Sequence, residues 1–573
     1  MTEPSEPLHS IGRLRILLLA IALLLVAALV RLAEWQVVRH EELQALIPQN
    51  SDAAQTRNTR GKILDRNGYP LAMDVWGYQI YASPSGMGDE ASRRRIAEQL
   101  AVLLKKPSSW VWGKLANPGL NYVPLDYQAP LQLGDTLQSR HIQGIGMQAT
   151  PLRMYPAGAL AAQAIGFVNL SNQGLYGVEE VYHRQLNGET AECQGEDNDD
   201  TPPARISLGV RTFQATPHAC DVVLTLDWAI QDVVERELAA GIQRTHSVGG
   251  SAIVVEPSTG RILAMASLPA FDLNKYSESA DTLFNNPAIS IDYEPGSVVK
   301  IMTMAAGLDS GMFTPQSSMV DSGEIIVGGF HIHDWDNKAH GRVSMVDILA
   351  QSLNVGAAYV STSIGQNKFY EYADRFGFAQ RTGVDLANEV SGQMRKPSMP
   401  TWHPSDLGTN SFGQGMTMTP LQVAMMASTI ANGGVLMKPY IVDALISQGR
   451  LQYVQPRAVR RVVSTDSART LAAMLADAVE KESIPATLPS VRIAGKTGTA
   501  SIPDPRTGKY DATWTIASFV GWAPYDNARF VVLVKLDKPQ TTEFGSLAAA
   551  PVFREIAKKL VVMLDMGAKD AGQ

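Results

Sequence analysis

Three short segments carry residue types that together could perform acyl transfer. In chain order they are Ser297-Val-Val-Lys300, Ser352-Leu-Asn354 and Lys496-Thr-Gly-Thr499. The first supplies an alcohol with an amine beside it, the second a hydroxyl and an amide, and the third a cation next to threonine hydroxyls. This inventory suits attack on a carbonyl that has a carboxylate nearby, through a covalent acyl-enzyme. Each segment alone means little, so the prediction depends on the ordered set.

Ser297 and Lys300 are predicted to be a nucleophile and its base. Pro295-Gly296 is a natural lead-in to a helix, and positions i and i+3 of a helix share a face. A serine hydroxyl is a poor nucleophile without a neighbouring base. Lysine is a base only when neutral, so its pKa must fall from about 10.4. Burial and a nearby cation would both lower this pKa.

Ser352 and Asn354 are spaced so that both side chains could project from one side of a short extended or loop segment. Ser352 would relay a proton toward the leaving amine, and Asn354 would hold the amide of the substrate. The alternative is an ordinary helix N-cap for a segment that begins near Val355.

Lys496 to Thr499 lie in a predicted strand. Gly498 would let the backbone of a substrate lie close to this strand and form β-type hydrogen bonds. Lys496 would lower the pKa of the base and attract an anion, while Thr497 and Thr499 would bind a carboxylate. The alternative is an edge strand with a solvated lysine.

Bulk properties exclude several classes of protein. A chain of 573 residues is expected to form two or three domains. The net charge of -7 and the lack of a basic stripe argue against nucleic-acid binding. The chain has two cysteines, Cys193 and Cys220, which are too few for a disulfide scaffold or a cysteine-rich metal site.

Two minor features leave alternatives open. Cys193 and Cys220 bracket a polar stretch, 189–219, that is predicted to be a surface loop. They could close this loop as a disulfide in an oxidising compartment, or remain two thiols. His331-Ile-His333-Asp334 offers two imidazoles and a carboxylate without an obvious further ligand, so no metal is expected.

An apolar run near the N-terminus predicts a membrane segment. Residues 16–30 are uninterruptedly apolar, and a spanning helix needs about 20 residues. Arg13 and Arg15 precede the run and favour a cytoplasmic N-terminus. We therefore expect a cytoplasmic tail at 1–12, an anchor at 13–35 and the remainder outside the cytoplasm. The alternative is a cleaved signal peptide with its site near Ala27-Ala28.

The pattern of the later chain predicts a mixed α/β domain whose sheet joins its start to its end. An amphipathic helix is predicted earlier, at 90–105. The domain would open with a hairpin, continue with helices and close with strands and one helix. The predicted ranges are 251–266 for the hairpin, 297–375 for the helices, 491–501, 516–522 and 530–536 for the strands, and 551–563 for the closing helix.

The ordered segments resemble those of a class B penicillin-binding protein, a membrane-anchored D,D-transpeptidase of cell-wall synthesis. Several further stretches share this resemblance. They are Arg60-Gly-Lys-Ile-Leu-Asp-Arg-Asn-Gly68, Arg153-Met-Tyr-Pro156, Gly177-Val-Glu-Glu180, Thr225-Leu-Asp227, Thr259-Gly-Arg-Ile-Leu-Ala264, Phe412-Gly-Gln-Gly415, Phe519-Val-Gly-Trp-Ala-Pro524 and Ala550-Pro-Val-Phe553.

The resemblance implies a fold and a location. The fold would be mixed α/β, with a penicillin-binding-protein/β-lactamase-like transpeptidase domain at 245–565 in which helices flank an antiparallel sheet. This domain would stand on an elongated α+β pedestal, of the dimerisation type, at 45–235. One transmembrane helix would hold the protein in the bacterial cytoplasmic (inner) membrane, with its catalytic domain in the periplasm.

The resemblance also implies a reaction. Ser297 would attack the penultimate D-Ala carbonyl of a stem peptide ending in D-Ala-D-Ala, and the backbone N–H groups of Ser297 and Thr499 would form an oxyanion hole. An amine of a second stem would then take the acyl group. β-Lactam antibiotics would acylate Ser297, and no cofactor is implied. Glycan polymerisation would come from a separate membrane polymerase, alongside other cell-wall or division proteins.

Other functions remain as alternatives. A β-lactamase would hydrolyse the acyl-enzyme, but the pedestal, the anchor and the lack of a deacylating glutamate motif after Ser352 argue against it. A third alternative is a non-enzymatic β-lactam sensor or a scaffold for division proteins. A sensor would need several spanning helices or a cytoplasmic output domain, which the short segment before Arg13 cannot supply. Within the transpeptidases, the resemblance favours the septal branch over the elongation branch.

Overall fold

The computed structural model describes residues 59–190, 193, 205–208, 211–216, 218–503 and 510–566. The predicted tail at 1–12 and anchor at 13–35, together with the signal-peptide alternative, lie outside this range. No helix within the described part of the chain is both long and apolar enough to cross a bilayer.

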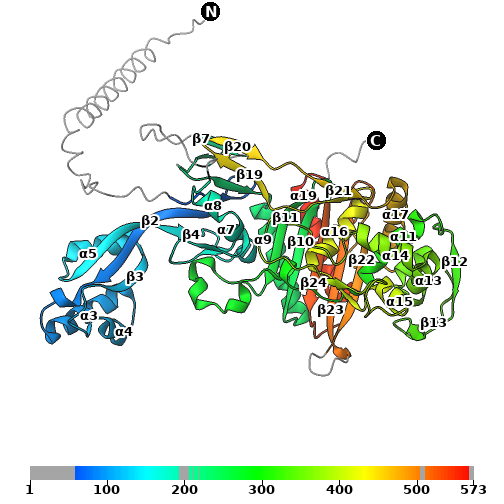
Figure 1. The fold of residues 1–573 in the computed structure, drawn as a ribbon, viewed down its shortest axis with the longest axis horizontal. Coiled ribbons are helices and arrows are strands. Elements are labelled where there is room, and N and C mark those ends of the chain that lie inside the picture. Colours follow the sequence, from blue (N-terminus) through cyan, green and yellow to red (C-terminus); the bar gives the residue numbers. More distant parts are fainter. Residues whose placement is uncertain are drawn as a thin grey trace, which may run out of the picture. The chain divides into compact units, whose positions relative to one another are not determined.

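A five-stranded antiparallel sheet forms the centre of the later domain (Figure 1). Its order is β11-β10-β24-β23-β22, so the first two strands of the domain pair with its last three. This confirms the predicted sheet that joins the start of the domain to its end. The strands are β10 (Gly249–Glu256), β11 (Arg261–Leu268), β22 (Ala494–Pro503), β23 (Tyr510–Ala523) and β24 (Phe530–Asp537).

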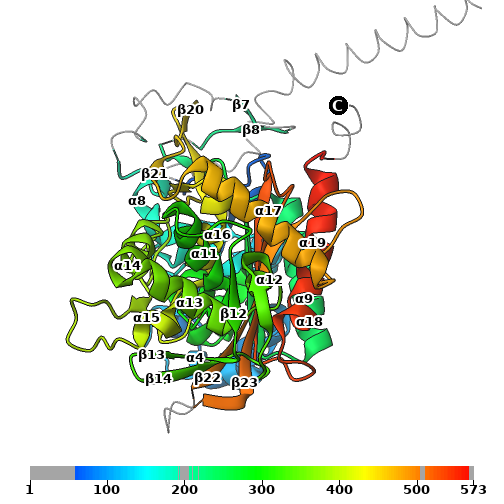
Figure 2. The ribbon, with the colours of Figure 1, turned by 90° about the vertical axis from the view of Figure 1, so that its right-hand side faces the viewer.

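Helices cover both faces of this sheet, which explains why its strands read as nearly continuous apolar runs. Successive side chains alternate between faces: Ala252 and Val254 pack with α9 and α19, whereas Ile253 and Val255 pack in the cluster that includes α11 and α16. Figures 1 and 2 show these two layers. The helices are α9 (Trp228–Thr245), α11 (Lys300–Asp309), α16 (Pro420–Ala431), α17 (Thr465–Lys481) and α19 (Ala550–Met563).

The region predicted to be helical from 297 to 375 also contains four short strands, so that prediction was wrong in part. Two pairs form, β12 with β15 and β13 with β14. Each strand has four residues, which is too short for an alternating pattern to stand out from the neighbouring helices. The elements are η5 (Gly296–Val299), β12 (Ser318–Asp321), β13 (Glu324–Val327), β14 (Phe330–His333), β15 (Gly341–Ser344), α12 (Met345–Ala350), α13 (Asn354–Ile364) and α14 (Gln366–Arg375).

Several short elements connect the layers of this domain. They are η3 (Leu273–Glu278), η4 (Asp281–Leu283), α10 (Pro287–Ser290), β16 (Gln393–Met394), α15 (Asp406–Thr409), η6 (Asn410–Phe412), β17 (Met416–Thr417), β18 (Val435–Met437), β21 (Ala458–Arg461) and α18 (Gly545–Ala548).

A second, seven-stranded sheet combines strands from distant parts of the chain. Its order is β20-β19-β9-β1-β2-β3, with β4 also paired to β2. A turn at Asn67-Gly68 joins β1 to β2, and Gly68 has a φ of 82° there. The strands are β1 (Ile63–Leu64), β2 (Pro70–Ala82), β3 (Val123–Pro130), β4 (Ile145–Met154), β9 (Asp221–Leu224), β19 (Val442–Ser447) and β20 (Arg450–Tyr453).

The helix predicted at 90–105 is confirmed as α3 (Glu90–Leu104). Asp89 caps it by accepting the Ser92 N–H at 2.8 Å. Other short elements of the N-terminal part are η2 (Pro84–Gly86), α4 (Ser108–Leu115), α5 (Leu131–Arg140), α6 (Ala162–Ile165), β5 (Phe167–Val168), β6 (Gly174–Leu175), α7 (Gly177–Val181) and α8 (His183–Leu186).

A buried ion network joins three of the stretches that carry the resemblance. The Glu179 carboxylate forms ion pairs with Arg60, whose Nη2 is 2.6 Å away, and with Arg153, whose Nε is 2.8 Å away. Arg153 also pairs with Asp74 at 3.0 Å. Burial tends to raise the pKa of Glu179, but Arg153 and Arg60 outweigh it and hold this pKa below its ordinary value.

The stretch at 189–219, predicted to be a surface loop, contains a hairpin of β7 (Arg205–Leu208) and β8 (Arg211–Gln214). Cys193 and Cys220 form a disulfide with an S–S distance of 2.00 Å. Both cysteines are buried, and Cys220 directly precedes β9. The bridge therefore fastens this stretch to the seven-stranded sheet.

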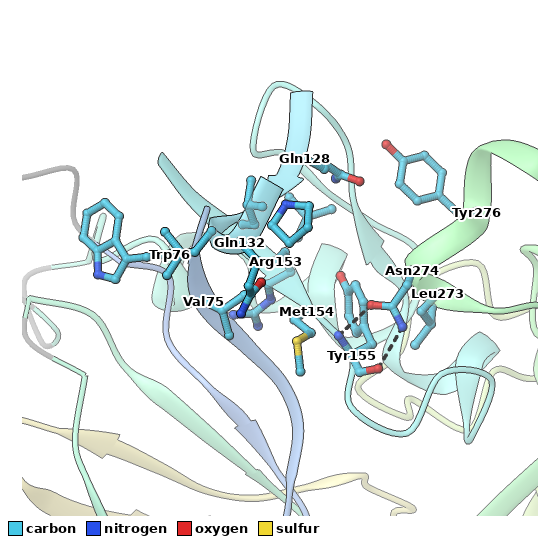
Figure 3. Close-up of a pocket in the computed structure, with 14 residues that line it drawn as sticks. Val75, Trp76, Gln128, Gln132, Arg153, Met154, Tyr155, Leu273, Asn274 and Tyr276 are labelled. Carbon is cyan, nitrogen blue, oxygen red and sulfur yellow. Dashed lines mark hydrogen bonds between the residues drawn. The ribbon is translucent and has the colours of Figure 1, made fainter. Parts of the chain in front are cut away.

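A cavity of about 480 Å³ opens between β2, β3 and β4 and the η3 segment (Figure 3). Trp76 and Arg153 line it from the sheet. The side chain of Asn274 closes one side by bonding both the N–H and the C=O of Tyr155, at 3.0 and 2.9 Å. No residue of the three acyl-transfer segments lines this cavity.

Candidate active site

The turn that carries Ser297 brings its hydroxyl to the amine of Lys300. Ser297 lies in the 3-10 turn η5, and Lys300 is the first residue of α11. In a 3-10 turn the side chains at i and i+3 eclipse each other. The Lys300 amine is accordingly 3.1 Å from Ser297 Oγ. The predicted proximity of this pair on one helical face is therefore present in the structure.

Lys300 is enclosed by hydrogen-bond acceptors. Its Nζ lies 2.5 Å from the Ser352 carbonyl, 2.8 Å from Asn354 Oδ1 and 3.3 Å from Ser352 Oγ. The residue is 1% exposed. Burial, followed by the charge of Lys496, lowers the pKa of Lys300 well below its ordinary value, while Asp334 opposes this shift. The arrangement therefore favours a neutral amine beside Ser297.

Ser352 lies between two amines. Its Oγ accepts a hydrogen bond from Lys496 Nζ at 2.9 Å and lies 3.3 Å from Lys300 Nζ. Its backbone has a φ of 59°, in the left-handed region that serine rarely adopts. This strained conformation lets the carbonyl and the hydroxyl of one residue both reach Lys300.

Asn354 begins α13, so the expectation of an extended segment through both residues was only partly right. Ser352 is in the loop, whereas Asn354 is the first helical residue. The side-chain N-cap alternative is wrong, because the N-cap residue Leu353 makes no such bond. Instead Asp334 Oδ1 accepts the N–H groups of Asn354 at 2.5 Å and Val355 at 3.1 Å. Sequence reasoning considered Asp334 only as a metal ligand and missed this role.

Lys496 lies on β22, the edge strand of the five-stranded sheet. It is 2% exposed, and burial lowers its pKa to about 7, against a weak opposing effect of Glu482. Its amine also lies 3.2 Å from Thr497 Oγ1. The alternative of a solvated lysine on an ordinary edge strand is therefore wrong.

Gly498 and Thr499 are both constrained by neighbouring parts of the protein. A Cβ at Gly498 would lie 2.4 Å from Ser518 Oγ and 3.0 Å from the Pro295 carbonyl. The structure thus gives a reason for this glycine other than the approach of a substrate, namely close packing of β22 against η5. Thr499 Oγ1 accepts the Gly545 N–H at 3.2 Å.

The segment Phe412-Gly-Gln-Gly415 supports the nucleophile turn from behind. The Gly296 N–H donates to the Gly413 carbonyl at 3.1 Å. Gly413 has a φ of 80°, and a Cβ there would lie 2.2 Å from the Gly296 carbonyl oxygen. Gly415 donates its N–H to Glu294 Oε1 at 3.1 Å. The close approach to Gly296 explains why a glycine is needed at Gly413, far along the chain from Ser297.

Two exposed aromatic rings flank the site and were missed by sequence reasoning. Trp335 and Phe544 are 60% and 40% exposed, and their ring centroids are 6.0 Å apart. Trp335 Nε1 donates to the Gln351 carbonyl beside Ser352, and Phe544 precedes Gly545. No local pattern links these two positions, because they meet only through the fold.

The histidines near the site do not assemble with Asp334 as a metal site. His331 Nδ1 is hydrogen-bonded to Glu324, and His333 Nε2 lies 3.6 Å from the same carboxylate. Asp334 instead faces the start of α13. Among the described residues, no group of three or more histidine, cysteine, aspartate or glutamate side chains could hold a metal ion.

Together, the structure gathers the polar atoms of all three segments. Ser297, Lys300, Ser352, Asn354 and Lys496 form one connected hydrogen-bond network. Thr497 joins it through Lys496. Chemically, the arrangement presents a partly exposed alcohol beside a buried amine of lowered pKa, with a second amine nearby. These are the parts that serine acyl transfer requires.

Comparisons with known proteins agree with this geometry. The sequence matches the penicillin binding protein transpeptidase domain over residues 250–558 and the penicillin-binding protein dimerisation domain over residues 55–201. It is 30% identical to penicillin-binding protein PbpB of Mycolicibacterium smegmatis, over 95% of this chain and 89% of that one. It is 29% identical to the peptidoglycan D,D-transpeptidase FtsI of Escherichia coli K12, over 94% of this chain and 89% of that one.

The fold is also similar to that of a solved structure, penicillin binding protein 3 of Mycobacterium tuberculosis complexed with aztreonam. The TM-score is 0.68 at 28% sequence identity, and the match covers 89% of this chain and 97% of the other. Since the transpeptidase family alone spans more than half of the sequence and relatives match over nearly all of it, the chain belongs to the class B penicillin-binding proteins.

Proposed function

We propose that the protein is a peptidoglycan D,D-transpeptidase that cross-links stem peptides ending in D-Ala-D-Ala. The observation that carries the proposal is the 3.1 Å contact between Ser297 Oγ and a buried Lys300 amine whose pKa is lowered. The relative from Escherichia coli is named a peptidoglycan D,D-transpeptidase, and the structural neighbour binds a β-lactam.

In the proposed acylation step, neutral Lys300 takes the proton of the Ser297 hydroxyl as its oxygen attacks the penultimate D-Ala carbonyl. The backbone N–H groups of Ser297 and Thr499 stabilise the oxyanion. Ser352 passes a proton to the departing D-Ala amine, which is consistent with its position between Lys300 and Lys496. The products are an ester on Ser297 and free D-Ala.

In the second step an amine of another stem peptide attacks the ester, giving the cross-link and restoring the Ser297 hydroxyl. Asn354 holds the amide of the substrate, while Lys496, Thr497 and Thr499 hold its terminal carboxylate. β-Lactams, which carry a strained amide near a carboxylate, enter the same path and remain on Ser297.

Labelling with a fluorescent penicillin tests this assignment. Wild type and the control Ser310→Ala should label covalently, whereas Ser297→Ala should not. Ser310 is a suitable control because its Oγ donates to the Gly307 carbonyl at the far end of α11. Persistent labelling of Ser297→Ala would show that the nucleophile is misassigned. Fast multiple turnover of a chromogenic cephalosporin would favour a β-lactamase instead.

We also propose that the protein acts at the division septum, held in the cytoplasmic membrane by an anchor at 13–35, with a pedestal at 45–235 and a transpeptidase domain at 245–565. The similarity to FtsI and the apolar run support this proposal. Its partners would be a membrane glycan polymerase and other division proteins. A fluorescent fusion should mark the envelope at mid-cell, and uniform lateral labelling would favour the elongation branch.

A further inference from the structure

Two buried carboxyl groups lie directly behind the segment that carries Asn354. Asp321 ends β12 and Asp334 follows β14, and they are 1% and 2% exposed. Each uses one oxygen locally. Asp321 Oδ1 accepts the Gly323 N–H at 2.7 Å, and Asp334 Oδ1 accepts the first two N–H groups of α13.

The second oxygens of the two carboxyl groups have no such donor. Within the described part of the chain, Asp321 Oδ2 and Asp334 Oδ2 are both buried and neither meets an N–H or O–H group. The two side chains are instead within hydrogen-bonding reach of each other. Two carboxylates are acceptors only, so a bond between them requires a proton on one. A buried pair without that proton would also suffer like-charge repulsion.

We propose that Asp321 and Asp334 share one proton and act as a positioning pair, which fixes the start of α13 and thereby the amide of Asn354 against Lys300. The inference rests on the proposed role of the Ser297 site. It explains why Asp334, with no capping residue available at Leu353, can hold two N–H groups with one oxygen while its other oxygen stays satisfied in a dry environment.

The shared proton also matters for the charge near the base. Burial raises the pKa of Asp334 to about 6, and hydrogen bonding to Asp321 adds to this rise. The charge of Asp334 in turn raises the pKa of Lys300. A pair holding one proton carries one negative charge instead of two, and so favours the neutral amine that acylation needs.

Other charged groups lie on the elements near the pair. They are Lys300 on α11, Lys496 on β22, Arg342 on β15, Glu324 with His331 and His333 on the β13–β14 hairpin, and Asp336, Lys338 and His340 in the following loop. The loop groups pair among themselves: His340 lies 3.2 Å from Asp336. A histidine titration must therefore be separated from that of the pair.

Infrared difference spectroscopy on the full chain reads the proton directly. At pH 6 the spectrum should contain the C=O stretch of a protonated carboxylic acid, which disappears as pH rises because the proton is lost. Asp321→Asn and Asp334→Asn should each remove this band, whereas Asp477→Asn, at an exposed site, should leave it. A band that survives both substitutions, or its absence in wild type, would overturn the proposal.

Acylation by a fluorescent penicillin measures the consequence. Asp321→Asn places a permanent N–H donor against Asp334, so its acylation rate at pH 6 should stay within about threefold of the wild-type rate. The change in acylation rate that wild type shows near pH 6 should be absent from this variant. Asp321→Leu leaves a buried oxygen without a partner and should acylate about tenfold or more slowly. The same pH step in Asp321→Asn would overturn the inference, as would normal acylation by Asp321→Leu.

If Asp321→Leu does not fold, the infrared band and the pH dependence of acylation in Asp321→Asn test the proposal without it. If the shared-proton proposal is wrong but the proposed function is right, the fluorescent penicillin still labels wild type and still does not label Ser297→Ala. This result distinguishes failure of the pair proposal from failure of the proposed function. A change in acylation rate near pH 6 that persists in Asp321→Asn and vanishes in a variant with His331→Gln, His333→Gln and His340→Gln combined would assign that change to the histidines, and it too would overturn the inference.

Discussion

At the scale of single residues, the proposed reaction depends on two buried lysines with opposite tasks. In that reaction Lys300 has to be neutral to accept a proton, while Lys496 has to carry a charge to attract a carboxylate. Burial lowers both pKa values, and the charge of Lys496 lowers the pKa of Lys300 further. The charge of Lys496 thus favours the neutral form of Lys300.

Removal of this cation should move the pH profile of acylation. Lys496 lowers the pKa of Lys300, so in Lys496→Ala that pKa rises and the amine keeps its proton to higher pH. The rising limb of the acylation rate should shift to higher pH, and the rate should fall throughout because the carboxylate loses its partner. The measurement is the second-order rate constant with a fluorescent penicillin from pH 5 to 10.

Lys558→Ala is the matched control, since its side chain is 64% exposed on α19 and should leave the profile unchanged. If the acylation rate of Lys496→Ala rises over the same pH range as that of wild type, the charge of Lys496 does not affect the pKa of Lys300.

At the scale of elements, two loops meet behind the nucleophile turn. Gly413 follows η6, and its carbonyl accepts the Gly296 N–H. The backbones approach so closely that the space for a side chain is absent: a Cβ at Gly413 would lie 2.2 Å from Gly296 O and 2.8 Å from Gly296 C. The position of Ser297 is therefore set by a segment more than a hundred positions away.

Gly413→Ala should displace the turn and slow acylation. Misplacement of reacting groups by about 1 Å can cost about 100-fold, and we expect a loss of this order with a fluorescent penicillin. Gly311→Ala is the control, because Gly311 also has a positive φ, 73°, but no atom lies within 4 Å of its Cβ position. It should lose about 1–2 kcal/mol of stability and keep its acylation rate. Equal rates in both variants would exclude the packing argument.

At the scale of the whole molecule, the catalytic sheet and the N-terminal sheet are built from interleaved parts of the chain. β19 and β20 come between α16 and α17 of the later domain; β19 pairs with β9 and β20 with β19, so both extend the seven-stranded sheet. The stretches Arg60-Gly and Arg153-Met-Tyr-Pro meet Glu179, which lies on α7 in the stretch Gly177-Val-Glu-Glu. Their shared role is a buried ion network that fixes the sheet.

Glu179→Gln should destabilise the fold without touching the site. It leaves Arg60 and Arg153 buried without their carboxylate, and breaking a buried pair costs about 3–5 kcal/mol. Because the folded pKa of Glu179 lies below 4.5, the stabilisation is present above that pH and is lost as pH falls through the folded pKa. Urea unfolding at pH 7 and at lower pH measures both effects.

Glu90→Gln is the control, because Glu90 pairs with Arg94 on the surface of α3 at 63% exposure. A surface pair contributes at most about 1 kcal/mol. A similar loss in both variants would mean that the buried network does not stabilise the protein.

Much of this protein could be predicted from local patterns. The spacing of Ser297 and Lys300 predicts their proximity on one helical face. Periodicity over a few residues predicts the sheet strands and the closing helix α19, and tertiary packing leaves these local preferences unchanged. The three segments were recognisable because their residue types are unusual in combination. The β12–β15 strands were missed because four residues carry too little periodicity.

Other properties exist only in three dimensions. The Asp321–Asp334 pair, the Trp335–Phe544 rings and the contact of Gly413 with Gly296 join positions whose separation in sequence carries no signal. The pKa directions at Lys300 and Lys496 likewise depend on burial, which the chain acquires on folding. Sequence thus determined which chemical groups are present and in what order, whereas topology decided which of them touch, because long-range contacts and low dielectric arise only from packing.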